Sequence, residues 1–399
     1  MPTLPARLAR RLLSLDDFER AAQRHLPRPL FGYIAGAAED NQAFHANRQA
    51  FAHYALLPRV LVDIAQRSTA RELFGVRYAQ PFGIAPMGIS ALTAYRGDLV
   101  LARAAGQAQV PMIMSGSSLI RLEDVAKANP QAWFQAYLPG DEANILALVE
   151  RVKRAGFGTL VITVDVPLAA NRENNLRSGF SLPLRPTPRL AWDGLSHPRW
   201  LLGTFLRTLL RHGMPHFENN YAYRGAPVLS PKALRDYSDR GHLHWAHLAL
   251  IRRHWPGRLV VKGILHPADA QRAQAEGADG VIVSNHGGRQ LDGALAPLHA
   301  LPAVIAACPG LPVMLDSGVR RGTDVIKALA LGAAFVFVGR PFGFAAAVGG
   351  EAGVAHALGL LGSEVSRDLA LLGLCTLDEL GPALLAPAGA PLQMPAQAG

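Results

Sequence analysis

The sequence predicts a single α/β domain built as a (β/α)8 TIM barrel, with a helical flank at its N-terminus and one long insertion after the fourth strand. Short apolar runs rich in β-branched and aromatic residues recur along the chain, and alanine-rich stretches with helical periodicity separate them. Six of the seven intervals between run starts are 22–32 residues, which suits one strand and its crossover helix. The remaining interval, from 159 to 258, is 99 residues and must hold the insertion.

The eight apolar runs are the expected barrel strands. In chain order they are FGIAP (82–86), PMIM (111–114), WFQAY (133–137), TLVITVD (159–165), RLVVK (258–262), GVIVS (280–284), PVMLD (312–316) and FVFVG (335–339). The stretch 328–350 is apolar enough to suggest a membrane span, but Arg340 and Pro341 lie at its middle. Since an Arg at the bilayer centre costs about 2.5–3.5 kcal/mol, we interpret this stretch as a helix, a buried strand and another helix.

Composition places the chain among ordinary globular proteins. Half of the residues are apolar and 18% are charged, so a substantial core can form. The net charge of +10 indicates an anionic partner: nucleic acid, an anionic lipid surface or an acidic small molecule. Two cysteines, Cys308 and Cys375, argue against a disulfide scaffold and favour a reducing compartment, and the N-terminus lacks the apolar region of a secretory signal.

The domain expected from these patterns spans residues 1–386. It comprises helices within 1–60, a barrel over about 82–350 and an insertion over about 177–240, followed by a Pro/Ala/Gly tail at 387–399 that we expect to be disordered. Within the insertion, 177–216 carries six Arg and one acid, Asp193, beside Trp192, Trp200 and the run WLLGTFLRTLLRHGM. This pattern suits either an interfacial helix on an anionic membrane or a lid or oligomer contact with solvated arginines.

Barrel enzymes carry their catalytic groups at the carboxyl ends of the strands, and polar residues gather there in this sequence. After the sixth strand comes Ser-Asn-His-Gly-Gly-Arg-Gln-Leu-Asp (284–292), which puts a possible base, His286, and a possible carboxylate clamp, Arg289, on one tight turn. A lone barrel histidine is more often structural, but the whole nonapeptide after a strand favours catalysis. Asp165 either orients an imidazole or caps the next helix.

The last two strands end in LDSGVRRG (315–322) and FVGRP (337–341). Loops at these two positions often bind phosphate in barrels, because glycines expose backbone N–H groups and helix N-termini favour anions. Arg320 and Arg340 would add charge-assisted contacts. We therefore expect a phosphate-bearing cofactor or substrate. Lys262 ends the fifth strand and either forms a Schiff base or stabilises a reduced, negatively charged ring.

These residues together resemble the FMN-dependent L-2-hydroxy acid dehydrogenase and oxidase family, from about Leu15 to Leu380. The resemblance implies that His286 is the base and Asp165 its carboxylate partner, and that substrate is bound by Tyr33, Tyr137, Arg172 and Arg289. It implies that FMN is held by Pro86, Met87, Gly88, Ser115, Gln135, Thr163, Lys262, Ser284, Asp316, Ser317, Gly318, Arg320, Gly339 and Arg340. It implies no metal.

Three further features refine this expectation. Gly88 occupies a small-residue position that is Ala in glycolate oxidase and Gly in several bacterial dehydrogenases, which disfavours a dedicated oxidase, and Ser117 stands where glycolate oxidase has a bulky Trp. Met87 and Ser317 depart from the residues of many relatives at positions that contact flavin through the backbone. The segment 197–219 is similar to the membrane-associated segment of the family member (S)-mandelate dehydrogenase.

The function that this resemblance implies is oxidation of an (S)-2-hydroxy acid to the 2-keto acid, with (S)-mandelate or a related aryl substrate giving benzoylformate. Electrons would pass to a membrane quinone, in a homotetramer bound peripherally to the cytoplasmic face of the inner membrane through 177–216. The alternatives are a flavin-type L-lactate dehydrogenase, an oxidase that uses O2, and a soluble cytoplasmic location. A nucleic-acid-binding protein is disfavoured because no recognised module is present, and an inactive flavin scaffold is disfavoured because His286, Arg289, Arg172 and Asp165 are retained.

Overall fold

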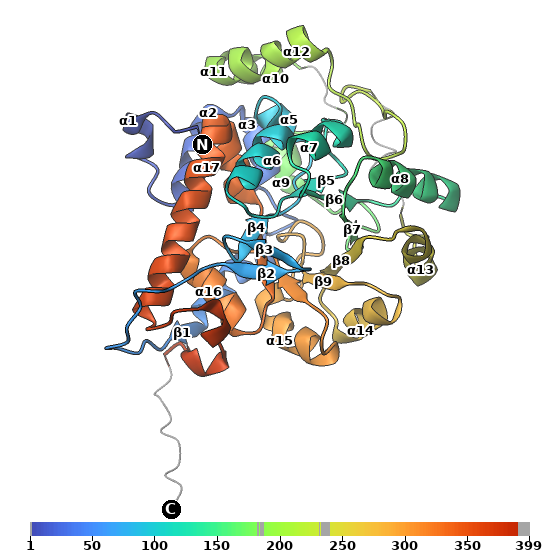
Figure 1. Cartoon of the computed structure of the whole chain (residues 1–399). Coiled ribbons are helices and arrows are strands. Elements are labelled where there is room, and N and C mark those ends of the chain that lie inside the picture. The colour runs from blue at the N-terminus through green and yellow to red at the C-terminus, as the bar shows by residue number, and fades with distance from the viewer. Residues whose placement is uncertain (1, 182, 184–186, 231, 233–239, 390–399) are drawn as a thin grey trace, which may run out of the picture.

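Eight parallel strands form a barrel at the centre of the molecule in the computed structural model, which describes residues 2–181, 183, 187–230, 232 and 240–389 (Figure 1). The strands are β4 (Phe82–Ile84), β5 (Ile113–Ser115), β6 (Trp133–Ala136), β7 (Thr159–Thr163), β8 (Arg258–Ile264), β9 (Gly280–Val283), β10 (Val313–Leu315) and β11 (Phe335–Val338). They pair in the order β4-β11-β10-β9-β8-β7-β6-β5, and a parallel bridge between Ile84 and Met112 joins β4 to the chain just before β5. The predicted barrel and its eight strands are confirmed.

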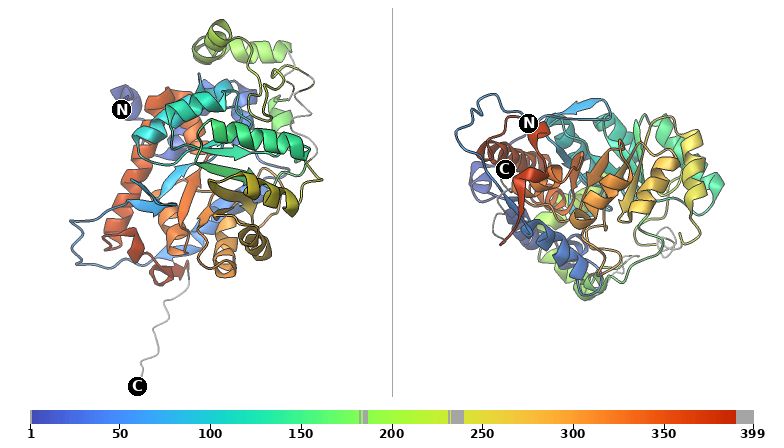
Figure 2. Two further views of the ribbon diagram at one scale, coloured as in Figure 1. Left: turned by 45° about the vertical axis from the view of Figure 1, so that its right-hand side comes forward. Right: turned by 90° about the horizontal axis from the view of Figure 1, so that it is seen from below.

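Helices surround the strands, and Figure 2 shows this outer layer from two further sides. They are α5 (Ser90–Thr93), α6 (Gly97–Gln107), α7 (Leu122–Ala128), α8 (Glu142–Arg154), α13 (Trp245–His254), α14 (Pro267–Ala275), α15 (Pro297–Ala307), α16 (Gly322–Ala330) and α17 (Arg340–Leu371). Helix α8 illustrates why they form. Asp141 caps its N-terminus by accepting from the Asn144 backbone N–H at 2.8 Å, and Ile145, Leu148, Val149 and Val152 form one buried stripe.

The barrel interior is filled by large side chains and is closed at one end by a hairpin that the sequence did not predict. The hairpin pairs β2 (Arg71–Leu73) with β3 (Val76–Tyr78). Its Tyr78 ring lies 5.6 Å from that of Phe335, and Phe74 lies 5.6 Å from Trp133. Because Trp133 and Phe335 begin β6 and β11, the hairpin covers the amino ends of the strands. The carboxyl ends are thus left for a functional site.

The N-terminal flank consists of α1 (Ala6–Ala9), α2 (Leu15–His25), α3 (Arg28–Ala35) and α4 (Gln42–Ala52). After it, β1 (Tyr54–Leu56) pairs with β12 (Leu385–Pro387), beyond the 3-10 turns Leu377–Glu379 and Pro382–Leu384. Helix α17 packs between α2 and α6. It is long and apolar enough to cross a membrane, but half of its most apolar stretch is buried inside the protein. The predicted helix, strand and helix at 328–350 are α16, β11 and the start of α17.

The insertion between β7 and β8 rises above the barrel as α9 (Glu173–Ser178), α10 (Pro188–Leu195), α11 (Pro198–Trp200), a π-helical turn (Leu201–Leu206) and α12 (Arg207–His212) (Figure 1). Trp200, one of the two tryptophans that left an interfacial helix or a lid contact open, is buried, and its Nε1 donates to the Leu92 carbonyl at 2.8 Å. Arg207 lies over the Tyr95 ring at 3.9 Å. These contacts dock the segment on the barrel. The later part of the insertion, 231 and 233–239, and the tail from 390 lie outside the described residues.

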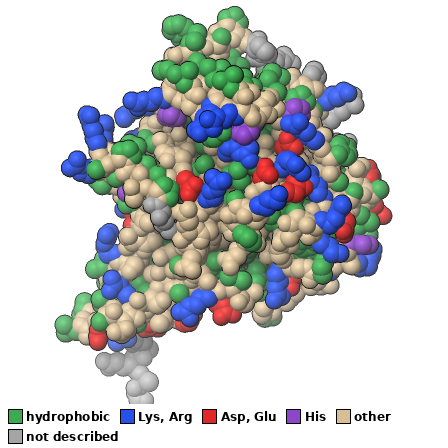
Figure 3. All heavy atoms as spheres, turned by 45° about the horizontal axis from the view of Figure 1, so that its top comes forward, with side chains coloured by type: hydrophobic (Ala, Val, Ile, Leu, Met, Phe, Trp, Pro, Cys, Tyr) green, Lys and Arg blue, Asp and Glu red, His purple; other side chains and the backbone are tan. Residues whose placement is uncertain are grey.

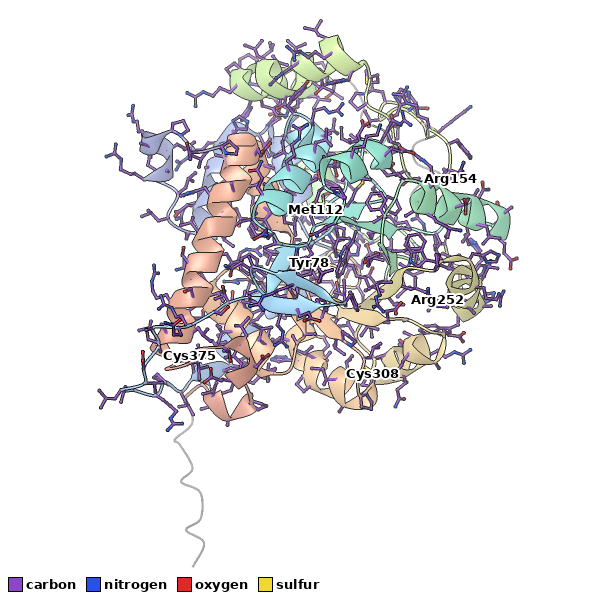
Figure 4. All side chains as sticks on the ribbon, viewed as in Figure 1. Tyr78, Met112, Arg154, Arg252, Cys308 and Cys375 are labelled. Atoms are coloured by element: carbon purple, nitrogen blue, oxygen red, sulfur yellow. The ribbon has the colours of Figure 1, made fainter. Side chains whose placement is uncertain are left out.

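The two cysteines are free thiols and lie far apart, as Figure 4 shows. Cys308 is buried after α15, and Cys375 lies in the C-terminal segment after α17. The structure therefore agrees with the expectation that the chain is not a disulfide scaffold.

Candidate active site

A pocket lies at the carboxyl ends of the barrel strands and contains most of the residues that the sequence predicts to be functional. Those that line it are Tyr33, Pro86, Met87, Gly88, Tyr137, Thr163, Arg172, Lys262, His286, Arg289, Asp316, Ser317, Gly318, Arg320, Gly339 and Arg340. The other four, Ser115, Gln135, Asp165 and Ser284, contact the lining residues or one another. The fold thus brings together residues from positions 33 to 340.

His286 and Asp165 form a hydrogen-bonded pair, with 2.9 Å between imidazole Nδ1 and carboxylate Oδ1. Burial alone would raise the pKa of Asp165, but the charges of His286 and Lys262 outweigh it and hold that pKa below its ordinary value. Burial lowers the pKa of His286, and the charges of Lys262 and Arg172 lower it further. Asp165 raises this pKa, but the net effect is a lowered value. The carboxylate therefore accepts from Nδ1–H, and the neutral ring keeps a lone pair on Nε2. Nε2 lies 3.4 Å from the Tyr137 hydroxyl.

The turn that carries His286 is held in a left-handed backbone conformation. His286, Gly287 and Gly288 have φ values of 59°, 66° and 74°. The backbone N–H of His286 donates to Ser284 Oγ at 3.0 Å, and that of Gly287 donates to Ser317 Oγ at 3.0 Å. A Cβ at position 288 would lie 2.6 Å from the Phe44 nitrogen, so only glycine fits. These bonds hold the imidazole in place despite the unusual φ of a non-glycine residue.

Two guanidinium groups stand beside the imidazole. Arg289 Nη1 donates to the Tyr33 and Gly36 carbonyls, each at 2.7 Å, and its Cζ lies 4.9 Å from the Tyr33 ring centroid. Arg172 Nε donates to the Arg289 carbonyl at 3.0 Å. Burial and then the neighbouring charge of Arg172 lower the pKa of Arg289 to about 10, so Arg289 stays charged at neutral pH. Adjacent half-buried guanidinium groups of this kind suit a bound carboxylate.

Lys262 is buried at the end of β8 with an anionic neighbour. Its Nζ lies 3.2 Å from Asp316 Oδ2 and donates to Ser284 Oγ at 3.0 Å. Burial would lower the pKa of Lys262, but Asp316 and Asp165 reverse this effect and raise it. A protonated amine cannot attack a carbonyl, so the geometry favours electrostatic stabilisation over a Schiff base.

The carboxyl ends of β10 and β11 form a cationic region. Buried Arg320 follows β10 and half-buried Arg340 begins α17. Gly318, with a φ of 91°, and Gly339 lie beside them in the sequence. Burial lowers the pKa of Arg340, and the charges of Arg289 and Arg320 lower it further. An anion at the α17 N-terminus would relieve this repulsion, as phosphate does in other barrels.

Buried donors next to the pocket provide a further test of whether FMN fits here. Within the described residues, Gln135 Nε2 and Thr163 Oγ1 are buried and have no hydrogen-bond partner. Both lie at the carboxyl ends of neighbouring strands, β6 and β7, and both belong to the predicted flavin set. A buried polar group without a partner costs about 1–3 kcal/mol. A heteroaromatic ring with carbonyl and nitrogen acceptors would satisfy them, so the residues present fit FMN.

Small residues leave room on the side of the pocket near Tyr33. A Cβ added to Gly88 would lie 3.1 Å from the Ser117 Cβ and 3.3 Å from the Tyr33 hydroxyl. Ser117 itself is buried and lines the pocket. A larger side chain at either position would therefore reduce the space available to the substrate.

Several lining residues were missing from the predicted site, namely Ile34, Ser90, Thr93, Val166 and Arg240. Arg240 is the notable one because it comes from the end of the insertion, where no motif marks it. Its guanidinium Cζ lies 5.1 Å from the Tyr137 ring centroid. Val166 directly follows Asp165 and could have been inferred from that position.

The pocket combines a His–Asp pair, two adjacent arginines and a cationic region suited to phosphate at the carboxyl end of a barrel. These features define a flavin-dependent oxidoreductase that acts on a small carboxylic acid. The family model described as FMN-dependent dehydrogenase matches residues 22–387. The chain is 38% identical to (S)-mandelate dehydrogenase of Pseudomonas putida, over 94% of each, and 40% identical to L-lactate dehydrogenase of Pectobacterium atrosepticum, over 90% of this chain and 92% of that protein. The crystal structure of the monotopic membrane protein (S)-mandelate dehydrogenase matches with a TM-score of 0.87 and 37% identity, covering 94% of this chain and 99% of that one.

The chain therefore belongs to the FMN-dependent dehydrogenase family, and it is a 2-hydroxy acid oxidoreductase with FMN as its cofactor. The resemblance inferred from the sequence is confirmed.

Proposed function

We propose that the protein oxidises an aryl-substituted (S)-2-hydroxy acid, such as (S)-mandelate, to the 2-keto acid. The observation that carries this proposal is the His286–Asp165 pair beside the Arg172 and Arg289 guanidiniums in one pocket. The arginines bind the carboxylate and place the substrate carbon near His286 Nε2, which takes a proton. Tyr137 donates a hydrogen bond to the substrate hydroxyl, and Tyr33 contacts the carboxylate. FMN, when bound, supplies the acceptor for two electrons.

The roles that we propose for the cofactor-binding residues follow from their positions at the carboxyl ends of the barrel strands. Lys262 holds a positive charge at the end of β8, where it would stabilise negative charge on the reduced cofactor. Arg320 and Arg340 would bind the phosphate, with the backbone of Gly318 and Gly339. The remaining contacts with the cofactor are those of Pro86, Met87, Gly88, Ser115, Gln135, Thr163, Ser284, Asp316 and Ser317.

The pH dependence of kcat/KM tests the proposed base. A protonated imidazole cannot accept a proton, so we expect kcat/KM to fall as pH drops through the pKa of His286, which burial places below its ordinary value. Asp165 raises that pKa, so Asp165→Asn should move the acid limb to lower pH. The same variant should lower kcat by about 10²–10⁴-fold, because an amide no longer fixes the tautomer. An acid limb that moves to higher pH in Asp165→Asn would contradict the assignment.

Substrate choice rests on the space around Gly88 and Ser117. We expect a higher kcat/KM for (S)-mandelate than for L-lactate, and Ser117→Trp should lower the mandelate value by about 10–100-fold because overpacking costs about 1–3 kcal/mol. The L-lactate value should change by less than about 3-fold, since the smaller methyl group leaves space. Ser117→Ala is the matched control and should keep mandelate activity.

The second candidate substrate is L-lactate, which the 40% identity to L-lactate dehydrogenase of Pectobacterium atrosepticum favours. A wild-type enzyme that strongly prefers L-lactate, with the same loss for both substrates in Ser117→Trp, would replace mandelate with lactate in this proposal.

We further propose that the insertion binds the cytoplasmic face of the inner membrane and that electrons pass to a quinone there. Trp192, Leu202 and Leu210 have exposed fractions of 70%, 64% and 85%, and Arg189 and Arg211 belong to the same helices. Figure 3, in which the top of Figure 1 comes forward, shows hydrophobic side chains gathered over this segment with Lys and Arg side chains around it. Stoichiometric peroxide production in air at the rate seen with quinone analogues would favour the oxidase alternative instead.

Vesicle binding tests the membrane contact. The triple variant Trp192→Ser, Leu202→Ser, Leu210→Ser should lower partitioning onto phosphatidylglycerol-containing vesicles by at least about 100-fold, since each buried apolar side chain contributes about 1.5–3 kcal/mol. Its turnover with a soluble acceptor should stay unchanged. Leu371→Ser, which alters an equally exposed leucine (66%) on α17, is the control and should still bind. Equal partitioning of the triple variant and wild type would exclude these three side chains from the contact, and a wild type that does not bind the vesicles would favour the soluble alternative.

The oligomeric state is proposed to be a homotetramer, by analogy with the family to which the chain belongs. Light scattering of the purified holoenzyme measures it, and a monomer mass would overturn it.

A further inference from the structure

The end of the insertion returns to the barrel at Arg240, next to the residues from which the insertion departs. The Arg240 backbone N–H donates to the Pro167 carbonyl at 2.9 Å. Pro167 is only two residues beyond Asp165, so this bond clamps the two ends of the long insertion together at the mouth of the pocket. Arg240, at the end of the insertion, is therefore anchored to the barrel where it lines the pocket.

The Arg240 side chain reaches a third segment, the end of β6. Its Nε donates to the Leu138 carbonyl at 3.2 Å, and its Cζ lies 5.1 Å from the centroid of the Tyr137 ring. A guanidinium within about 6 Å of an aromatic face is attracted by the ring quadrupole. The hydrogen bond to the Leu138 carbonyl fixes the guanidinium over the face of the Tyr137 ring.

Tyr137 in turn contacts the proposed base. Its hydroxyl lies 3.4 Å from His286 Nε2, and the two rings are 6.4 Å apart with an interplanar angle of 30°. A hydrogen bond of this length is weak, so small rotations of the half-buried phenol decide whether its hydroxyl meets Nε2 or a substrate atom. A group that packs against the Tyr137 ring can therefore determine where the phenol hydroxyl lies.

We propose that Arg240 is a positioning residue for Tyr137, through which the end of the insertion sets the orientation of the phenol hydroxyl beside His286. The inference rests on the function proposed above, because it needs Tyr137 to contact the substrate hydroxyl. It adds a residue that neither the motifs nor the paired arginines 172 and 289 include. It also joins the end of the insertion to the segments that follow β7 and β6 through hydrogen bonds to Pro167 and Leu138.

A double-mutant cycle in the holoenzyme tests this role, with Arg240→Gln, Tyr137→Phe and the double variant. Arg240→Gln should lower kcat by about 3- to 30-fold, the range of a cation–π contact, with a smaller change in KM. In the Tyr137→Phe background the same change should cost less than about 2-fold, because the hydroxyl that Arg240 orients is already missing. Arg240→Lys keeps a cation near the ring and should recover part of the loss.

Controls separate this role from general effects of charge or folding. Arg253→Gln removes the same charge from an exposed position on α13 and should leave kcat unchanged. Thermal melting and the bound-flavin absorbance of each variant report folding and cofactor retention independently of activity. Equal losses from Arg240→Gln in both backgrounds, or no loss in the wild-type background, would overturn the inference alone. Full activity in Tyr137→Phe would instead overturn the role that the proposed function gives to Tyr137.

Discussion

Replacing His286 with Asn is expected to lower kcat by about 10²–10⁴-fold while FMN stays bound, because a positioned general base contributes about that much. The reason is geometric: Nδ1 is held by Asp165 at 2.9 Å, so Nε2 is the only ring nitrogen left to accept the substrate proton. Because burial keeps the ring neutral, this base is available at neutral pH. Steady-state turnover on (S)-mandelate, with the flavin absorbance recorded for the same sample, measures the effect.

The control for His286→Asn is His254→Asn, which alters an exposed histidine on α13 and should leave turnover unchanged. Near-normal turnover in His286→Asn with FMN bound would remove the imidazole from the mechanism.

The second large effect is expected at Lys262. Lys262→Met leaves the buried Asp316 carboxylate without its cation at 3.2 Å, and breaking a buried ion pair costs about 3–5 kcal/mol of the free energy of unfolding. The variant should also lose most of its activity, since no positive charge remains at the end of β8 to stabilise the reduced cofactor. Chemical denaturation and turnover measure the two effects on one preparation.

A double variant separates the structural effect of Lys262 from the functional one. Lys262→Met with Asp316→Leu removes both charges, and replacing a buried pair by apolar residues is often neutral for stability. We expect the double variant to recover most of the unfolding free energy and to remain inactive. If activity returned with stability, the lysine would have a structural role only.

The fold could be predicted from the sequence because each barrel strand is a separate apolar run. For example, β11 is a run of four apolar residues, Phe335–Val338, between Ala-rich helices, and all four are buried. The repetition of such runs and helices along the chain predicts the parallel sheet. The β2–β3 hairpin could not be predicted in this way. Its strands are three residues each, and Tyr78 is buried through tertiary packing that includes the Phe335 ring.

Some residues of the proposed site could likewise be predicted from a local motif, and others could not. His286 and Arg289 share one local turn, and Gly288 is required by a backbone 2.6 Å away, so a short motif could mark them. Arg240 lies in the pocket through tertiary contacts that include those with Pro167 and Leu138, about 70 to 100 residues away in sequence. The sequence left the environment of Trp200 open, because a Trp in a basic apolar segment suits either an interfacial helix or a lid contact. The Leu92 carbonyl, rather than the membrane, receives its indole N–H.

The central claim is that this pocket oxidises a 2-hydroxy acid with His286 as the base, and an anaerobic titration of the purified holoenzyme tests it most directly. Flavin absorbance and 2-keto acid are measured as (S)-mandelate, L-lactate and (R)-mandelate are added. We expect an (S)-2-hydroxy acid to bleach the flavin with one 2-keto acid formed per flavin, and His286→Asn to bleach at least about 100-fold more slowly. A flavin that none of these acids bleaches, or equal bleaching rates in wild type and His286→Asn, would contradict the claim.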